Sequence, residues 1–388
     1  MKLEIYDTTL RDGEQGPYNW MNPSQKLGLA LNLKDLGVDI IESGFPASNP
    51  DDYNAVYEIS RQVKDVAISA LARARKGDID KAASALEHAS DPMVHVFLPA
   101  SKLHIEKKLG LDYDNVYDLA CEMIGYAKGK VGRVIFGAED ASRAEPGYLS
   151  RLMNGVADAG AEMFVFADTV GYLQPGEIFH LINSLYKARI SNGRNEKELI
   201  KLGIHCHNDL GQAVTNTLES IRHGVSHIQT TLLGIGERAG NAAIEQIIMA
   251  LECRPDYFEN VHTHEKIEHH INLIKLVDAC EYLADVIGLP IPRDQPVLGS
   301  NCFRHSSGIH AHGIIIDPKT YEVINPQLIG RQTSIMIGKH TGKHGRAYVK
   351  EHSMGDTSSA ISFDVKRNLE RMNEFFRRVR GQNEVMFC

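Results

Sequence analysis

The feature that most constrains this fold is an eightfold alternation of short apolar runs with amphipathic stretches. Each run has the length and residue types of a strand, and each stretch has the apolar spacing of a helix. Some stretches open on helix-start signals such as Asn22-Pro23 and Asn49-Pro50. Eight such units in about 250 residues predict an α/β fold, the (β/α)8 TIM barrel. The predicted strands are 3–9, 38–44, 67–72, 93–99, 133–139, 163–169, 202–207 and 226–232.

An open, doubly wound sheet also alternates strands with helices and is the main alternative. Two observations favour the barrel. The units number eight, and polar residues follow the ends of the predicted strands, which in a barrel converge on one mouth. No G-x-G-x-x-G motif follows the first run, so a dinucleotide site has little support.

The pattern changes after residue 252, and we expect three parts. Residues 1–252 form the catalytic barrel, 253–298 form a helix and a proline-rich connector, and 299–388 form a mostly helical C-terminal subdomain. The apolar spacing predicts one long helix from Thr263 to Ile287. A further helix with a basic end is expected over residues 362–380.

The composition argues against several classes of protein. The chain has 42 Lys and Arg against 50 Asp and Glu and no basic run, so we expect no nucleic acid or membrane partner. The six cysteines form no C-x-x-C pair, which is typical of reduced thiols. There is no signal segment and no apolar run of the roughly 20 residues that cross a bilayer. We therefore expect a soluble, cytoplasmic protein.

The pattern His-x-His occurs three times, and the copies differ in their setting. His205 and His207 end the seventh predicted strand, where residues two apart point to the same side and could reach one ion. The copy at 262–264 is interpreted as structural, with Thr263 as a helix N-cap. The copy at 310–312 lies outside the barrel.

Two polar blocks accompany the first copy. The first strand is followed by DTTLRDGEQ at 7–15, and the eighth by GIGERAGN at 234–241. Two imidazoles, a carboxylate and an amide oxygen make a mixed N/O site, which suits a catalytic Mg2+, Mn2+ or Zn2+ ion. The alternatives are an ion-paired barrel rim at the first block and, at the second, a phosphate-binding helix start or a tight loop.

These motifs identify a resemblance. DTTLRDGEQ at 7–15, HCHND at 205–209 and GIGERAGN at 234–241 together resemble the DRE-TIM metallolyase superfamily. Within it, the chain is similar to the Claisen-condensing synthases, the family of 2-isopropylmalate, homocitrate and citramalate synthases. The segment 306–322 resembles that family's C-terminal subdomain. The lyase and aldolase branches fit less well, because they lack the GERxGN loop and this segment.

The resemblance implies an acyltransferase that condenses acetyl-CoA with a 2-oxo acid and then hydrolyses the thioester, which releases CoA. It implies that Asp12, His205 and His207 hold a divalent metal ion, with Asn241 beside them. The ion would make the keto carbon electrophilic. The family forms homodimers in which the C-terminal subdomain of one chain covers the barrel mouth of its partner.

The resemblance also implies roles for other side chains. For Glu139 the alternative is an ion pair with Arg143, and for Tyr321 it is a core or rim aromatic. The implied catalytic residues are Arg11, Glu139, His310 and Tyr321, and the implied substrate-binding residues are Gln15, Leu71, His95 and Thr169.

Some residues of the predicted substrate pocket indicate which 2-oxo acid is used. Asp12 in RDGEQ, GFPASN at 44–49 and an aliphatic Leu71 resemble the branch of the family that uses 2-oxoisovalerate in leucine biosynthesis. A homocitrate or citramalate synthase is the alternative, and a non-catalytic metalloprotein that binds oxo acids is a further one. At 388 residues the chain has no room for the regulatory domain of typical relatives, so we expect no inhibition by leucine through that domain.

Overall fold

The computed structural model describes residues 1–190 and 199–336. The chain divides into two compact units, the first covering Met1–Pro290 and the second beginning at Ile291. This division falls inside the segment 253–298 that was expected to contain the connector.

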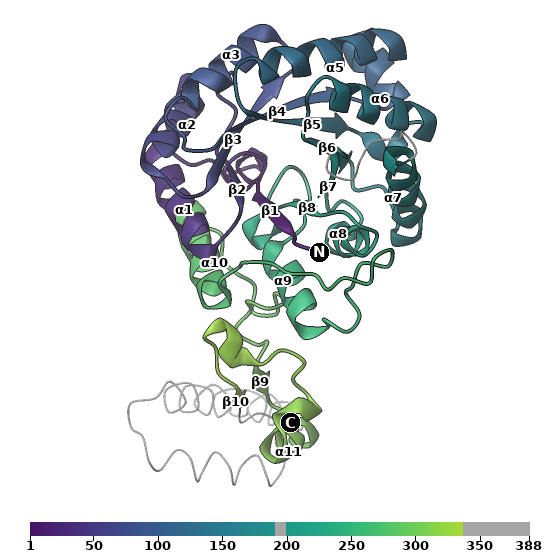
Figure 1. Cartoon of the computed structure of the whole chain (residues 1–388). Helices are drawn as coiled ribbons and strands as arrows, with labels where there is room; N and C mark the ends of the chain where they lie inside the picture. The colour runs from purple at the N-terminus through teal and green to yellow at the C-terminus, as the bar shows by residue number, and fades with distance from the viewer. Residues whose placement is uncertain (191–198, 337–388) are drawn as a thin grey trace, which may run out of the picture. The chain divides into compact units, whose positions relative to one another are not determined.

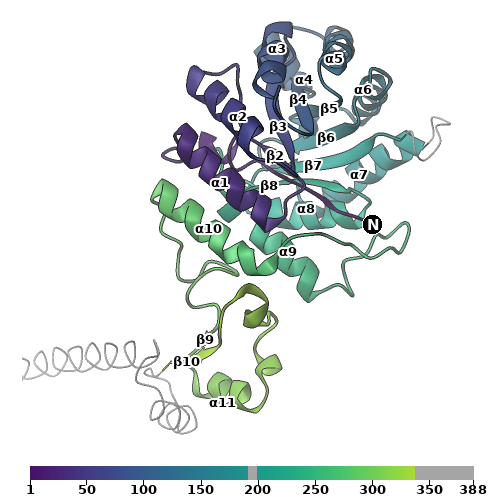
Figure 2. The same ribbon diagram turned by 60° about the vertical axis from the view of Figure 1, so that its left-hand side comes forward.

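Eight parallel strands close into a barrel in which each strand pairs with the next and β8 pairs with β1 (Figures 1 and 2). Closure is direct, since Tyr6 on β1 lies opposite Gln229 on β8. The predicted TIM barrel is confirmed, and the open sheet is wrong. The strands are β1 (Glu4–Asp7), β2 (Ile40–Glu42), β3 (Ala67–Arg73), β4 (Pro92–Pro99), β5 (Arg133–Glu139), β6 (Met163–Asp168), β7 (Lys201–Cys206) and β8 (His227–Thr230).

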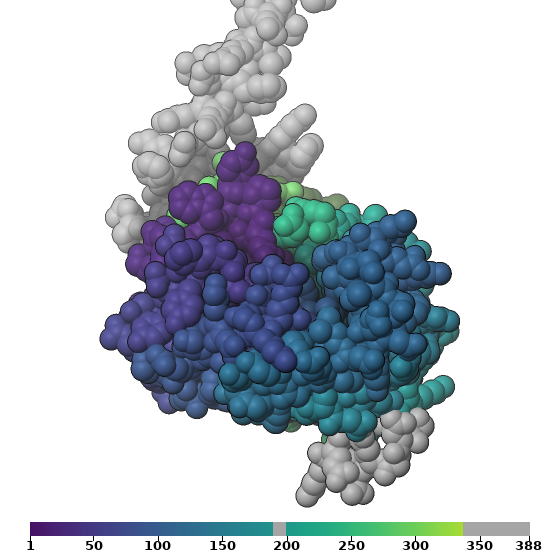
Figure 3. All heavy atoms as spheres, turned by 90° about the horizontal axis from the view of Figure 1, so that it is seen from above, coloured from purple at the N-terminus to yellow at the C-terminus, as the bar shows by residue number. Residues whose placement is uncertain are grey.

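Helices surround the strands (Figure 2). Residues of the first half of the chain, coloured purple to blue, form much of the face seen in Figure 3. The predicted helix starts are present. Asn22 forms a capping box with Gln25, and the Asn49 side chain accepts a hydrogen bond from the backbone of Asp52. The helices are α1 (Pro23–Leu36), α2 (Pro50–Gln62), α3 (Lys76–Ala85), α4 (Lys102–His104), α5 (Tyr113–Lys128), α6 (Pro146–Asp158), α7 (Pro175–Ile190), α8 (Ala213–Arg222), α9 (Ile244–Cys253) and α10 (Leu273–Ile287).

Side chains from several strands fill the barrel interior. They interlock as a packed core, as expected of this architecture, so the barrel is not a pore. Short helical turns follow some strands, among them η1 (Gly13–Gln15), η3 (Ala141–Arg143) and η5 (Leu232–Gly234). The interior cluster consists of Tyr6, Ile40, Ala67, Met93, Ile135, Met163 and Val165.

The predicted long helix from Thr263 is wrong over its first ten residues, because α10 begins only at Leu273. The backbone of Glu268 instead pairs with the start of the chain: its N–H donates to Met1 and its carbonyl accepts from Leu3. A backbone that bonds to another segment in this way cannot also form helical hydrogen bonds. Thr263 therefore caps no helix, and its hydroxyl donates to Glu265 in a turn.

The described part of the second unit combines short helices with a two-stranded parallel sheet. Glu322 joins its parts, because its carboxylate lies 3.1 Å from His305 Nε2 and accepts hydrogen bonds from the Thr333 hydroxyl. The helix expected over residues 362–380 lies outside the described residues. The elements are β9 (Arg304–His305), α11 (Gly308–Ile316), η6 (Pro318–Thr320), η7 (Pro326–Ile329) and β10 (Ser334–Ile335).

Within residues 1–190 and 199–336, the helices are all too short or too polar to span a bilayer.

A carboxyl group without a cation is buried at the start of α9. Glu245 is fully buried, and its Oε2 accepts a hydrogen bond from the Leu233 backbone. Its Oε1 has no hydrogen-bond partner among the described residues. Burial raises the pKa of Glu245 from 4.5 to about 7, since the charged form loses its hydration. Between these two pH values the folded chain binds more protons than the unfolded chain, so stability falls as the pH rises.

We therefore expect Glu245→Gln to be more favourable at pH 8 than at pH 5. The unfolding free energy of the variant, relative to that of the wild type, should rise by on the order of 3 kcal/mol over this interval. Thermal melts at both pH values measure the change. The matched substitution Glu122→Gln, on the exposed side of α5, should show no such trend. A difference independent of pH would contradict the prediction.

Candidate active site

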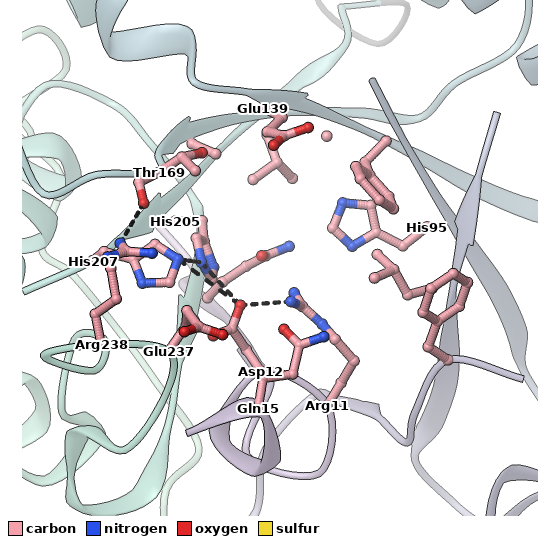
Figure 4. Close-up of a pocket in the computed structure, with 17 residues that line it drawn as sticks. Arg11, Asp12, Gln15, His95, Glu139, Thr169, His205, His207, Glu237 and Arg238 are labelled. Carbon is pink, nitrogen blue, oxygen red and sulfur yellow. Dashed lines mark hydrogen bonds and ion pairs between the residues drawn. The ribbon is translucent and has the colours of Figure 1, made fainter. Parts of the chain in front are cut away.

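The carboxyl ends of the barrel strands surround one cavity of about 240 Å3. Figure 4 shows side chains from successive strand ends pointing into it. Such a mouth is where TIM-barrel enzymes carry their active sites. The lining residues are Arg11, Asp12, Gln15, Phe45, Leu71, His95, Phe97, Gly137, Glu139, Val165, Ala167, Thr169, His205, His207, Gln229, Glu237 and Arg238.

Three buried side chains form a potential metal centre at the floor of this cavity. Asp12, His205 and His207 each offer one ligand atom, and these atoms lie within 4.8 Å of one another. The two histidine Nε2 atoms are 3.2 Å apart, and they lie 3.5 and 4.0 Å from Asp12 Oδ2. The arrangement brings together the three residues that the resemblance implied as ligands.

Local structure explains this convergence. His205 and His207 flank Cys206 along an extended backbone, so both imidazoles face the cavity while Cys206 is buried on the other side. Asn241 follows β8 and pairs with His207 through a backbone bridge. Its Nδ2 donates to Asp12 Oδ1 over 3.0 Å. Gly236 permits this approach, because a Cβ there would collide with the Asn241 amide.

The protonation states of the three residues suit a cation. Burial lowers the pKa of His205 to about 3, and it also lowers the pKa of His207, so both rings are neutral at pH 7. Burial would raise the pKa of Asp12, but Arg11 and the two imidazoles outweigh it and hold that pKa below its usual range. Neutral imidazoles and an ionised carboxylate are the forms that bind metals.

An unpaired polar atom beside these residues also suits a cation. The Asn241 Oδ1 atom is buried and has no hydrogen-bond partner among the described residues. The donor set of two nitrogens and carboxylate or amide oxygens, without a thiolate, is appropriate for a divalent cation with open positions. The residues present therefore fit the metal ion that the resemblance implies.

Arg11 connects this centre to a second buried network. Its Nη1 lies 2.5 Å from Asp12 Oδ2, and its Nε lies 2.6 Å from Glu42 Oε2. Glu42 Oε1 accepts a hydrogen bond from the Tyr6 hydroxyl and lies 2.9 Å from His95 Nδ1. Burial would raise the pKa of Glu42, but Arg11 and then His95 lower it to about 2. Because this carboxylate is ionised, His95 Nδ1 carries the proton in their hydrogen bond.

Sequence reasoning missed Glu42 and Tyr6 as parts of the site. The available signal for Glu42 was an acid at the end of an otherwise apolar run, two residues before a glycine. Tyr6 lies within the first strand and is fully buried, so its type alone predicts only a core residue.

The upper wall of the cavity carries Glu139, at the end of β5. Its carboxylate accepts hydrogen bonds of 2.6 and 2.9 Å from Lys108 Nζ. Lys108 belongs to η2 (Ile105–Leu109), a π-helical turn after β4. The alternative pair of Glu139 with Arg143 is not formed, because Arg143 bonds to Asp140 instead.

Thr169 lies beside Glu139 at the end of β6. Its Oγ1 accepts a hydrogen bond of 2.8 Å from the Asp140 backbone, which leaves its own hydroxyl proton free to donate elsewhere. The Thr169 carbonyl accepts a hydrogen bond of 2.7 Å from Arg238 Nη2 (Figure 4). Arg238 is held in turn by a bidentate pair with Asp209. This side of the cavity therefore offers a hydroxyl and a guanidinium for an anionic group.

The remaining wall is mostly apolar. Leu71, Phe45, Phe97 and Val165 line it, and Leu71 is only 5% exposed. Gln15, at the end of η1, also borders the cavity. The cavity thus has one charged end and one end suited to a hydrocarbon tail.

The structure brings all the predicted barrel residues together, either lining the cavity or, for Asn241, bonded to a lining residue. His310 and Tyr321 lie in the second unit, where their rings stack with centroids 4.1 Å apart. Their catalytic roles stay predictions.

Comparison with known families agrees with this geometry. Residues 2–283 match the family model described as HMGL-like, and residues 297–380 match the model described as homocitrate synthase post-HMGL domain-like. A 2-isopropylmalate synthase from Bacillus licheniformis is 40% identical over 97% of this chain and 68% of its own length. The chain belongs to the 2-isopropylmalate synthase branch of the HMGL-like family. The family expected from the sequence motifs is confirmed.

Other members of this branch are similarly close. The 2-isopropylmalate synthase of Nitratidesulfovibrio vulgaris is 42% identical over 88% of this chain and 65% of its own length. 2-Isopropylmalate synthase 1 of Caldanaerobacter subterraneus is 42% identical over 88% of this chain and 84% of its own. The chain thus spans about two thirds of the length of several of these relatives.

Solved structures of the HMGL-like family show the same fold. The HMG-CoA lyase from Brucella melitensis superposes with a TM-score of 0.61 at 18% identity, over 74% of this chain and 99% of that one. Hydroxymethylglutaryl-CoA lyase from Pseudomonas aeruginosa gives a TM-score of 0.57 at 22% identity, over 74% and 92%. These similarities support the barrel architecture alone.

Removal of the carboxylate at the centre should weaken metal binding. We expect Asp12→Asn to raise the dissociation constant for Mn2+ at least about tenfold, because a neutral amide replaces the charged ligand. Isothermal titration calorimetry measures the change. The control is Asp91→Asn, which removes a carboxylate that precedes β4 and pairs with Arg133. Equal affinities for Mn2+ in both variants would remove Asp12 from the metal centre.

Proposed function

We propose that this chain is an acyltransferase that condenses acetyl-CoA with a 2-oxo acid bearing a small aliphatic tail. 2-Oxoisovalerate, which gives 2-isopropylmalate and CoA, is the principal substrate. The observation that carries the proposal is the cluster of Asp12, His205 and His207 beside Arg11, facing a wall formed by Leu71 and its apolar neighbours. The names of the curated relatives support the same activity.

The charged end of the cavity binds and activates the 2-oxo acid. When bound, a divalent cation held by Asp12, His205 and His207 supplies Lewis-acid polarisation of the keto group. The Arg11 guanidinium lies next to Asp12 and stabilises negative charge as it develops on the keto oxygen. Mg2+, Mn2+ and Zn2+ all suit this set of ligands.

Thr169 and Arg238 orient the carboxylate of the 2-oxo acid. The Thr169 hydroxyl donates to it, since the Asp140 N–H already occupies the acceptor side of that oxygen. Arg238, fixed by Asp209, adds positive charge on the same side. Two anchors of this kind hold the keto carbon in one orientation toward the acyl donor.

The acyl donor must lose a methyl proton before it forms the new bond. We assign this general-base step to the stacked pair of His310 and Tyr321 in the second unit, with Glu139 as a further carboxylate on the cavity wall. The resulting enolate attacks the keto carbon, and the alkoxide takes up a proton. Water then cleaves the thioester, which leaves a carboxylate and CoA. Homodimers, in which the second unit of one chain serves the barrel of the other, are part of this proposal.

The tail end of the cavity supports an aliphatic substrate over 2-oxoglutarate. A distal carboxylate placed against Leu71, Phe97 and Val165 would lose its hydration without gaining a charged partner from them. Homocitrate synthase activity is therefore the weaker alternative.

The activity is tested by the release of CoA, followed with a thiol reagent, from acetyl-CoA and a panel of 2-oxo acids. The panel contains 2-oxoisovalerate, pyruvate, 2-oxobutanoate and 2-oxoglutarate, and the protein is supplied with a divalent metal. We expect the highest kcat/KM with 2-oxoisovalerate and loss of release after chelation. No release with any acid would refute the enzyme assignment, and a preference for 2-oxoglutarate would favour the homocitrate alternative.

The role of Leu71 in tail selection has its own test. We expect Leu71→His to raise the ratio of kcat/KM for 2-oxoglutarate to that for 2-oxoisovalerate by about tenfold, because an imidazole can pair with the distal carboxylate. Leu71→Met keeps an apolar side chain and serves as the control. An unchanged ratio in Leu71→His would show that Leu71 does not select the tail.

A further inference from the structure

The backbone beside Thr169 has an unusual conformation. Asp140 directly follows β5 and has a φ of 58° and a ψ of 34°, in the left-handed region. Residues other than glycine rarely adopt this region, and Asp and Asn are the side chains that tolerate it best. Arg238, which bonds to Thr169, also has a positive φ, of 56°. Non-glycine residues in such conformations cluster at functional sites, where the surrounding structure holds them.

Both left-handed residues bind Thr169. The Asp140 N–H donates a hydrogen bond of 2.8 Å to Thr169 Oγ1, and Arg238 Nη2 donates one of 2.7 Å to the Thr169 carbonyl (Figure 4). A hydroxyl oxygen that accepts a hydrogen bond on one side directs its own proton to another side. Because Thr169 lines the cavity, the direction of the Asp140 N–H decides whether the hydroxyl proton points into it.

The side chain of Asp140 keeps this turn from relaxing. It is fully buried, and its carboxylate accepts hydrogen bonds from the Ser101 hydroxyl and from Nε and Nη2 of Arg143. Ser101 is itself fully buried at the N-cap of α4, whereas Arg143 belongs to η3. The carboxylate is therefore held both by the loop after β4 and by its own turn. The backbone of Asp140 cannot rotate without breaking these buried hydrogen bonds, which would be costly.

We propose that Asp140 is a positioning residue for the 2-oxo acid: its anchored left-handed turn aims the backbone N–H at Thr169 Oγ1, so that the Thr169 hydroxyl donates into the cavity. The inference rests on the proposed function, in which this hydroxyl binds the carboxylate of the 2-oxo acid. Asp140 is not among the residues that line the cavity, so it acts through Thr169. A hydroxyl that is oriented in advance loses less conformational freedom when the ligand binds.

The same turn has two other neighbours whose effects must be distinguished from this one. Glu139 precedes Asp140 in the chain and lines the cavity itself, so a change in the turn can move its carboxylate. Arg143 pairs with Asp140, so loss of the Asp140 carboxylate releases a positive charge. Neither effect acts through the Thr169 hydroxyl, and both would persist in a variant that lacks this hydroxyl.

The test measures the dissociation constant of 2-oxoisovalerate by isothermal titration calorimetry, on the full chain supplied with Mn2+. Asp140→Asn keeps a side chain that tolerates the left-handed conformation and accepts from Ser101 and Arg143, so we expect a constant within about twofold of the wild type. Asp140→Gly permits the same φ without strain but removes the anchor, and we expect binding about fivefold weaker.

A second substitution shows whether the effect passes through Thr169. Thr169→Val replaces the hydroxyl with a methyl group, and we expect about tenfold weaker binding. Because no hydroxyl then remains to be oriented, adding Asp140→Gly to Thr169→Val should cause no further loss. The matched control is Asp65→Gly. Asp65 has a φ of 65° and precedes β3, at the opposite end of the barrel, so this variant should bind as the wild type does.

The outcomes separate this inference from the function on which it rests. The inference is wrong if Asp140→Gly binds as tightly as the wild type, if it weakens binding equally in Thr169→Val, or if Asp140→Asn is as weak as Asp140→Gly. If the wild type binds 2-oxoisovalerate but releases no CoA from acetyl-CoA, the proposed function fails and the variants still decide the inference. If the wild type binds no 2-oxoisovalerate, both are wrong.

One further variant covers the case in which Asp140→Gly does not fold. Ser101→Ala removes one donor to the same carboxylate and leaves Asp140 in place. We expect it to weaken the binding of 2-oxoisovalerate about threefold in the wild type and not in Thr169→Val. An equal loss in both backgrounds, or no loss in the wild type, would overturn the inference.

Discussion

One guanidinium holds the site together. Arg11 is the shared cation between Asp12, which belongs to the candidate metal centre, and Glu42, which is fully buried at the end of β2. Without it, two buried carboxylates would lose their counter-charge, a loss that typically costs several kcal/mol. The same side chain therefore keeps the candidate ligand Asp12 ionised and orients His95 through Glu42, and in the proposed reaction it stabilises the charge that develops on the keto oxygen. Substitutions of Arg11 would alter all three properties together, which is why Asp12 and Leu71 are the more informative positions to change.

The cavity at the barrel mouth has a charged end and an apolar end. At the charged end, Thr169, Arg238 and Arg11 supply donors for an anion, and neutral imidazoles keep their lone pairs available. At the tail end, a polar group of a ligand that is buried against Leu71 and Phe97 loses its hydrogen bonds to water and gains none from these apolar side chains, which costs binding free energy. In the proposed function, the tail end therefore selects among 2-oxo acids, and the charged end carries out the reaction that they share.

Features that depend on local chemistry were predictable from the sequence. The alternation that defines the barrel, the caps at Asn22 and Asn49 and the His205-x-His207 pattern each express rules about neighbouring residues. The failure at 263–272 has a different origin. The apolar spacing there is compatible with a helix, but the backbone of Glu268 pairs with the first three residues of the chain, and no local pattern reveals such a distant partner.

The missed members of the site have the same explanation. Tyr6 and Glu42 lie within predicted strands, and they join the site only when the closed barrel brings β1, β2 and β4 together. The motifs located the candidate metal ligands because those residues occur in blocks with recognisable spacing. The buried network around Glu42 depends on partners, Tyr6, Arg11 and His95, that only the three-dimensional structure identifies.

Cys206, between the two histidines, has a consequence for metal choice. Strand alternation turns its sulfur away from the cavity and buries it, and burial raises the pKa of this thiol far above its ordinary value. A thiolate is the ligand that attracts soft ions such as Cd2+ or Cu+. A shift of β7 by one residue would turn the Cys206 sulfur toward the cavity and both imidazoles away from it. The pairing of β7 with β6 and β8 in the closed barrel prevents such a shift. The alternation of side chains along β7 therefore keeps a soft sulfur ligand out of the candidate metal centre.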